Sequence, residues 1–169
     1  MKLDKKPFVI MLISSISFLG CLTQSAQYAS RPLYSITSNS VNSIDGPMYG
    51  EELLIVRGTS FSYGTRSITL LKLTTNDRIG YSFTLRLNSM NWQFLDTLPI
   101  NIDGKTTRLK ASRSDRNVIS GNNVEETYVF VLDNEMAESI KKCTALKFQI
   151  GADVVEIPNE GIQAIHNFM

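Results

Sequence analysis

The stretch Tyr81–Leu87 reads YSFTLRL and alternates strictly between apolar and polar side chains. Successive side chains of a β-strand point to opposite faces, so this alternation puts the apolar residues on one face and the polar residues on the other. A period of two therefore predicts a strand with one buried face. The residues expected to be buried are Tyr81, Phe83, Leu85 and Leu87.

Segments on both sides of this stretch have similar strand character. The clearest are Leu53–Arg57, Ser67–Thr75, Leu98–Ile102, Lys105–Lys110, Val124–Leu132, Ala145–Ile150 and Val154–Ile157. Leu33–Ile36 and Val41–Ile44 are expected to be short edge strands. Among the intervening turns, Asp103-Gly104 is the strongest hairpin signal, because a tight two-residue turn needs positive φ, which this pair tolerates.

Two short helices are predicted between and after these strands. Asp133 or Asn134 can cap a helix that runs to about Lys142, with acidic residues early and basic residues late, as the helix dipole favours. Asn159 is expected to cap a last helix that runs to the end of the sequence. Many strands with only two helices predict a mainly β (α+β) fold, built as an antiparallel β-sandwich or an open barrel.

Seven aromatic side chains fall on the faces of predicted strands. We expect them to be core residues, with a ligand-lining cluster as the alternative. The set comprises Tyr81, Phe83, Trp92, Phe94, Tyr128, Phe130 and Phe148.

The first 21 residues, MKLDKKPFVIMLISSISFLGC, combine a basic start with an apolar run that ends at a cysteine. The run from Phe8 to Leu19 includes serines and is shorter than the ~20 apolar residues that a transmembrane helix needs. This order resembles the signal peptide and lipobox of bacterial lipoproteins, with Phe18-Leu19-Gly20-Cys21 as the lipobox. A conventional secretory signal and a retained anchor are the alternatives.

The resemblance implies that residues 1–20 are removed and that Cys21 carries the lipid. The membrane is then the first expected partner, and the protein belongs to the bacterial cell envelope. Leu22 follows the cysteine where an aspartate would favour the inner membrane, so the outer membrane, facing the periplasm, is the expected location. Residues 21–32 are expected to be a flexible tether, and residues 33–169 a β-rich periplasmic domain.

The charges are balanced overall but segregated along the chain. Removal of residues 1–20 leaves 14 basic and 15 acidic residues, which gives no electrostatic case for a nucleic-acid partner. Residues 21–120 nevertheless carry a net charge of +4 and residues 121–169 a net charge of −5. The densest basic segment, residues 105–116, contains Lys105, Arg108, Lys110, Arg113 and Arg116.

Two interpretations of this basic segment stay open. It is either a solvated hairpin and loop that folds back on the acidic half, or a patch that faces an anionic surface. Such a surface would be lipid headgroups, lipopolysaccharide phosphates or an acidic envelope protein. Each lysine or arginine close to anionic lipid contributes about 1 kcal/mol, so five together would matter.

The sequence contains no recognisable catalytic, cofactor or metal site. The single histidine, His166, lies off the apolar stripe of the last helix and is expected at the surface, and zinc needs several histidine or cysteine ligands. Neighbouring residues of a strand point to opposite faces, so neither Glu51-Glu52 nor Glu125-Glu126 is expected to place two carboxylates in one site.

Two smaller features complete the search. The segment Asn101–Gly104 is similar to part of a calcium loop but lacks the closing carboxylate, so a hairpin is preferred. Cys143 is expected to be a buried free thiol. We therefore expect a non-catalytic binding or assembly module without a cofactor or metal. The alternative is a small envelope hydrolase that uses carboxylates or a serine–lysine pair.

Overall fold

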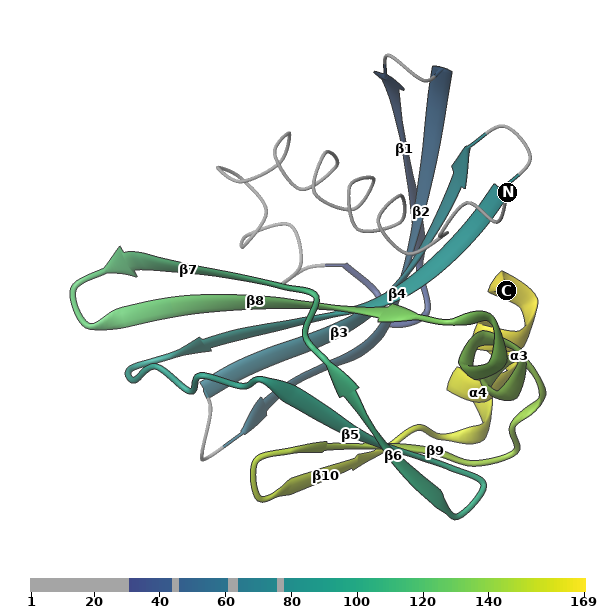
Figure 1. Ribbon diagram of the computed structural model, residues 1–169. Helices are drawn as coiled ribbons and strands as arrows, with labels where there is room; N and C mark the ends of the chain where they lie inside the picture. The colour runs from purple at the N-terminus through teal and green to yellow at the C-terminus, as the bar shows by residue number, and fades with distance from the viewer. Residues whose placement is uncertain (1–30, 44–45, 61–63, 76–77) are drawn as a thin grey trace, which may run out of the picture.

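The computed structural model describes residues 31–43, 46–60, 64–75 and 78–169, which form two antiparallel sheets and two helices (Figure 1). The mainly β fold with two short helices is therefore confirmed, and the sheets do not close into a barrel. The signal peptide, Cys21 and most of the expected tether lie outside the described residues.

The larger sheet has six strands in the order β1-β2-β3-β4-β8-β7, each antiparallel to its neighbours. The strands are β1 (Ile36–Ser43), β2 (Gly46–Ser60), β3 (Gly64–Thr75), β4 (Arg78–Ser89), β7 (Arg113–Ser120) and β8 (Asn123–Leu132). The first four form a meander, and β8 returns to pair with β4 after the chain has passed through the other sheet.

The smaller sheet has four strands in the order β10-β9-β5-β6. They are β5 (Thr97–Ile102), β6 (Lys105–Lys110), β9 (Leu146–Ile150) and β10 (Asp153–Glu156). The helices α3 (Asn134–Lys142) and α4 (Asn159–Phe168) lie together at one end of the molecule, as Figure 1 shows. Because α3 contacts β8 and α4 contacts β2, the helices cover part of the larger sheet.

The main core lies between the two sheets and beneath the helices. Phe83 of β4 and Phe148 of β9 meet edge to face across it, with their ring centroids 5.1 Å apart. The YSFTLRL stretch lies within β4, where Phe83, Leu85 and Leu87 are fully buried as expected. Tyr81 is half-buried, and its hydroxyl donates to the carbonyl oxygen of Met169 at 2.7 Å.

The helix ends confirm one predicted cap and contradict the other. The Asp133 side chain accepts a hydrogen bond from the amide of Met136, so it caps α3. Asn159 is not the cap of α4. Pro158 occupies that position, because its extended backbone (φ −69°, ψ 164°) leads into the helix and its carbonyl oxygen accepts from the amide of Ile162.

Four segments differ from the sequence-based expectation. Leu33–Ile36 and Val41–Ile44 are not two short strands, since β1 spans Ile36–Ser43 without a break, and β2 extends far beyond the predicted Leu53–Arg57. Neighbours on both sides supply the ladder of β2, so pairing overrides the weak strand propensity of its ends. Trp92 and Phe94 lie in a loop rather than in a strand, and Phe94 is exposed.

The predicted Asp103-Gly104 hairpin is present between β5 and β6. Both turn residues have positive φ, 49° at Asp103 and 88° at Gly104. The Asp103 carboxylate also accepts hydrogen bonds from the amides of Thr144 and Ala145, both at 2.8 Å. These bonds hold the pKa of Asp103 below its ordinary value and tie the hairpin to the segment that precedes β9.

Replacement of Gly104 by valine is expected to lower the free energy of unfolding by more than about 1 kcal/mol, because a β-branched residue resists positive φ. A Cβ at this position would meet nothing within 4 Å, so the loss is conformational. Gly58→Val is the matched control, since Gly58 also has open space but lacks positive φ. Urea denaturation compares the variants, and equal stability of the two would contradict the turn assignment.

Candidate functional site

The loop between β4 and β5 carries the chain from the larger sheet to the smaller one, and a side chain of β8 holds it in place. The amides of Gln93 and Phe94 donate to the two carboxylate oxygens of Glu126, at 2.6 and 3.1 Å. The next amide, that of Leu95, donates to the hydroxyl of Tyr128 at 2.9 Å. Three consecutive backbone amides are therefore fixed by two side chains of one strand.

Glu126 itself is fully buried. Its Oε1 also accepts from the Tyr128 hydroxyl at 2.5 Å and from Nε of Arg116 at 3.3 Å. Burial on its own would raise the pKa of this carboxyl, but the hydrogen bonds outweigh burial and hold the pKa below its ordinary value. Glu126 is thus a paired, ionised group rather than a proton donor. The pKa of Tyr128 is raised, first by burial and then by its bond to Glu126.

The loop displays an aromatic ring. Phe94 has a φ of 51°, which is an outlier for a bulky residue, and its side chain remains 59 % exposed. Such a backbone costs on the order of 1–3 kcal/mol and persists only where the surroundings enforce it. Here the bonds to Glu126 enforce it. The guanidinium of Arg116 lies 4.9 Å from the ring centroid, and the ring of Trp92 lies 6.3 Å away. We call Trp92, Phe94 and Arg116 the Phe94 surface.

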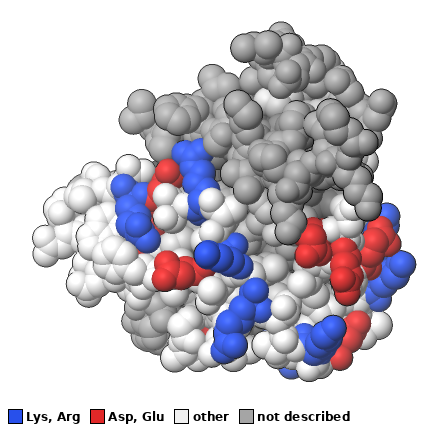
Figure 2. All heavy atoms as spheres, viewed as in Figure 1, with Lys and Arg blue, Asp and Glu red and all other residues white. Residues whose placement is uncertain are grey.

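The structure divides the predicted basic segment between the two sheets. Lys105, Arg108 and Lys110 belong to β6, whereas Arg113 and Arg116 belong to β7. The chain passes from one sheet to the other between two consecutive residues. The amide of Ala111 donates to the carbonyl oxygen of Asp96, beside β5, and the amide of Ser112 donates to the carbonyl oxygen of Val129 in β8. The segment is therefore not one continuous patch, and Figure 2 shows basic and acidic side chains interspersed on the visible face.

The two halves of the segment have different surroundings. Arg113 pairs with Asp115 at 2.9 Å, and Arg116 pairs with buried Glu126, so both interact within the fold. Arg108 and Lys110 are exposed. They share the outer face of the smaller sheet with Lys147 of β9, which the sequence analysis did not include. Lys147 also pairs with Glu156 at 3.0 Å.

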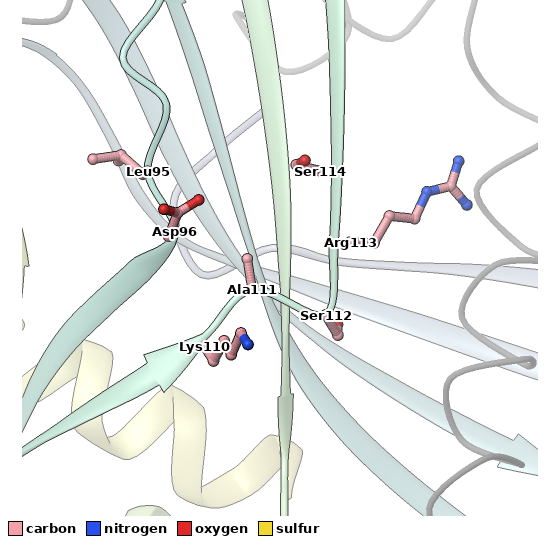
Figure 3. Close-up of a pocket in the computed structure, with 7 residues that line it drawn as sticks. All are labelled: Leu95, Asp96, Lys110, Ala111, Ser112, Arg113 and Ser114. Atoms are coloured by element: carbon pink, nitrogen blue, oxygen red, sulfur yellow. The ribbon is translucent and has the colours of Figure 1, made fainter.

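A cavity of about 430 Å³ opens where the chain changes sheets. Its lining residues, shown in Figure 3, are Leu95, Asp96, Lys110, Ala111, Ser112, Arg113 and Ser114. These include the residue types that a serine–lysine hydrolase would use. However, the Ser112 hydroxyl donates to the carbonyl oxygen of Val129 at 2.8 Å, so its proton is not directed to Lys110 or Asp96. No observation here favours the hydrolase alternative.

The remaining candidate residues from the sequence each interact with other groups of the fold. Glu51 pairs with Lys72 at 3.2 Å and Glu52 with Arg31 at 3.6 Å, so the two carboxylates have separate partners. His166 is not a solvated surface residue, because it is half-buried and its Nε2 lies 3.0 Å from the carbonyl oxygen of Cys143. This contact joins α4 to the end of α3.

Cys143 is a buried free thiol, as expected, and burial raises its pKa. Within the described ranges, no group of three or more histidine, cysteine or acidic residues is placed to hold a metal ion. Among the same residues, no helix is long and apolar enough to cross a membrane. Neither a known protein family, nor a curated protein, nor a solved structure matches the chain.

Sequence analysis missed the central role of Glu126, although the sequence contains a signal for it. In the strand VEETYVFVL, Glu126 shares its face with Val124, Tyr128, Phe130 and Leu132. A carboxylate on an otherwise apolar face of a strand must find hydrogen-bond donors when it is buried. Glu125 and Glu126 were considered only as a possible catalytic pair, and a buried structural role for Glu126 was therefore not predicted.

Replacement of Glu126 by glutamine is expected to lower the free energy of unfolding by about 2–4 kcal/mol, because the amide cannot serve four donors and leaves Arg116 without its anion. The native pKa of Glu126 is lowered, so its contribution is present above the ordinary glutamate pKa of about 4.3 and is lost as the pH falls through the native value. The variant should therefore lose less stability on acidification than the wild type does.

Urea denaturation at pH 7 and at successively lower pH measures both effects. Glu125→Gln is the matched control, because Glu125 lies next to Glu126 on β8 but points to the opposite face. It should change stability by no more than about 0.5 kcal/mol. Equal behaviour of the two variants would show that Glu126 does not hold the loop.

Proposed function

We propose that the protein is a membrane-anchored, periplasm-facing lipoprotein whose β-rich domain is a non-catalytic binding or assembly module. Support for the anchor comes from the order of basic residues, apolar run and Gly20-Cys21 at the amino terminus. The lipid chains on such a cysteine contribute about 0.8 kcal/mol per buried CH₂ group, which suffices for stable attachment when several chains are present.

The observation that carries the binding role is the exposure of Phe94. A fold gains nothing for its own stability by placing an aromatic ring in solvent on a strained backbone. Here a buried carboxylate and a buried tyrosine fix the loop, and an arginine covers one face of the ring. Aromatic residues and arginine are the types enriched at the energetic centres of protein interfaces. The Phe94 surface therefore suits a protein partner.

The segment between Cys21 and the domain is short, so a lipid on Cys21 would hold the domain close to the membrane. Nine residues lie between Cys21 and Arg31, where the described domain begins, and the ten Cα-to-Cα steps span at most about 35 Å when extended. A domain held this close to a bilayer can turn its exposed basic residues, Arg108 and Lys110, toward anionic headgroups. Salt limits this attraction to about one Debye length, near 10 Å, so it would orient the domain rather than anchor it.

The division of the basic segment predicts two different phenotypes. The double variant Arg108→Gln/Lys110→Gln should retain the wild-type melting temperature, because exposed charges contribute little to stability. With the Cys21→Ala background, it should bind less to vesicles that contain anionic lipid and show a weaker salt dependence. The double variant Arg113→Gln/Arg116→Gln should melt at a lower temperature, since it removes an ion-pair partner of buried Glu126. A lower melting temperature of Arg108→Gln/Lys110→Gln, together with weaker vesicle binding only of Arg113→Gln/Arg116→Gln, would refute this division.

Replacement of Cys21 by alanine is expected to abolish lipid attachment, so that the protein leaves the membrane fraction or stays unprocessed. Cell fractionation and mass spectrometry of the intact protein measure this directly. Cys143→Ala is the matched control, because Cys143 is a buried thiol of the domain and should not affect fractionation. An unmodified Cys21 within the wild-type mature chain would refute the lipoprotein assignment and leave the binding role to be tested separately.

A further inference from the structure

The strand β7 lies at the edge of the larger sheet. Among the described residues it pairs only with β8, from Arg113↔Val129 to Ser120↔Asn123. Every second residue of an edge strand directs its backbone N–H and C=O groups away from the sheet, where another strand can pair with them. The edge thus offers a row of main-chain hydrogen-bonding groups next to the Phe94 surface.

Three exposed side chains of β7 lie on the same face of the larger sheet as the buried Glu126 and Tyr128 of β8. Ser114, Arg116 and Val118 alternate along the strand and lie opposite Tyr128, Glu126 and Val124 of β8. Ser114 lines the cavity, together with residues from beside β5 and from the end of β6 (Figure 3). Arg116 lies over the Phe94 ring, and Val118 is 66 % exposed at the far end.

We propose that an extended segment of another protein adds to the larger sheet along β7. One side chain of this segment enters the cavity, the next on the same face packs against Phe94 and Arg116, and a third covers Val118. Side chains on one face of a strand are two residues apart, so the two that meet Phe94 and Val118 are apolar and two positions apart. The side chain that enters the cavity meets a mostly polar lining. Lys110, at the cavity, makes no ion pair among the described residues, and it favours an acidic residue at that end.

The same strand carries features that limit unselective pairing. The register of β7 and β8 shifts between Val118 and Ser120, and Arg113, Asp115 and Arg116 place charges along the edge. Bulges and charges are the means by which edge strands avoid aggregation. They also exclude segments that lack the matching pattern, so the edge is selective for its partner.

The inference deepens the proposed binding role and does not depend on the lipid anchor. The test uses the full chain with Cys21→Ala and a fluorescein-labelled peptide of about ten residues. The peptide has valine at alternate positions, threonine and serine between them, and aspartate at both ends. A second peptide has the same composition with its valines contiguous. Fluorescence anisotropy should show binding of the alternating peptide and at least about tenfold weaker binding of the contiguous one.

Phe94→Ala and Val118→Lys should each raise the dissociation constant of the alternating peptide at least about tenfold. Val154→Lys is the matched control, because Val154 is an equally exposed valine (65 % against 66 %) on β10, which is one of the two edge strands of the other sheet. It should leave the affinity unchanged. Absence of binding at millimolar peptide, or equal effects of Val118→Lys and Val154→Lys, would overturn the proposal.

A photo-crosslinking residue at position 118 distinguishes the other possible occupants of the edge. With the alternating peptide present, we expect a product that contains one chain and one peptide. A product of twice the chain mass, undiminished by the peptide, would assign the edge to a second copy of this chain. An internal crosslink to residues 22–30 would assign it to the chain's own amino-terminal segment. Either of these results would overturn the proposal of a foreign segment.

Discussion

The buried carboxylate of Glu126 is the interaction on which the connection between the two sheets depends. Removing a carboxylate from water costs several kcal/mol, and this cost is offset only when donors surround the group. Here the donors are two loop amides, a tyrosine hydroxyl and an arginine. Because the two amides belong to the loop between β4 and β5, the geometry that satisfies the charge also fixes where the smaller sheet begins and where the Phe94 ring is displayed.

Local patterns predicted the local structure well. The alternation of Tyr81–Leu87, the Asp103-Gly104 turn and the Asp133 cap each depend on a few adjacent residues, and all three are confirmed. Features that depend on distant partners were missed. No local pattern shows that the chain changes sheets at Ala111, since the residues on both sides of that point resemble ordinary strand residues. The display of Phe94 likewise depends on donors and acceptors more than thirty positions apart in the sequence.

For the candidate sites, too, features that depend on adjacent residues were predicted and features that depend on distant partners were missed. The group of cations between Lys105 and Arg116 could be predicted from the sequence, because these residues lie close together along the chain. Only the fold shows that Arg113 pairs with Asp115 and Arg116 with the buried Glu126. Arg108 and Lys110 instead share an exposed face with Lys147. The binding role proposed for the domain accordingly moves from the basic segment itself to the edge that the segment enters. There the exposed Phe94 ring, the cavity and the edge strand β7 lie close together.

The strand order has a consequence for how the protein is made. The pairing of β4 with β8 places Tyr81 opposite Leu132. The strand β5 pairs with β9, which is formed much later in the chain, and Ile100 lies opposite Phe148. The two sheets are thus interleaved along the chain, and neither half of the sequence contains a complete sheet with its covering layer. Long-range pairings of this kind form slowly, after loop closure. The two sheets can therefore form together only when almost the whole of the described chain is present, from β1 to β10.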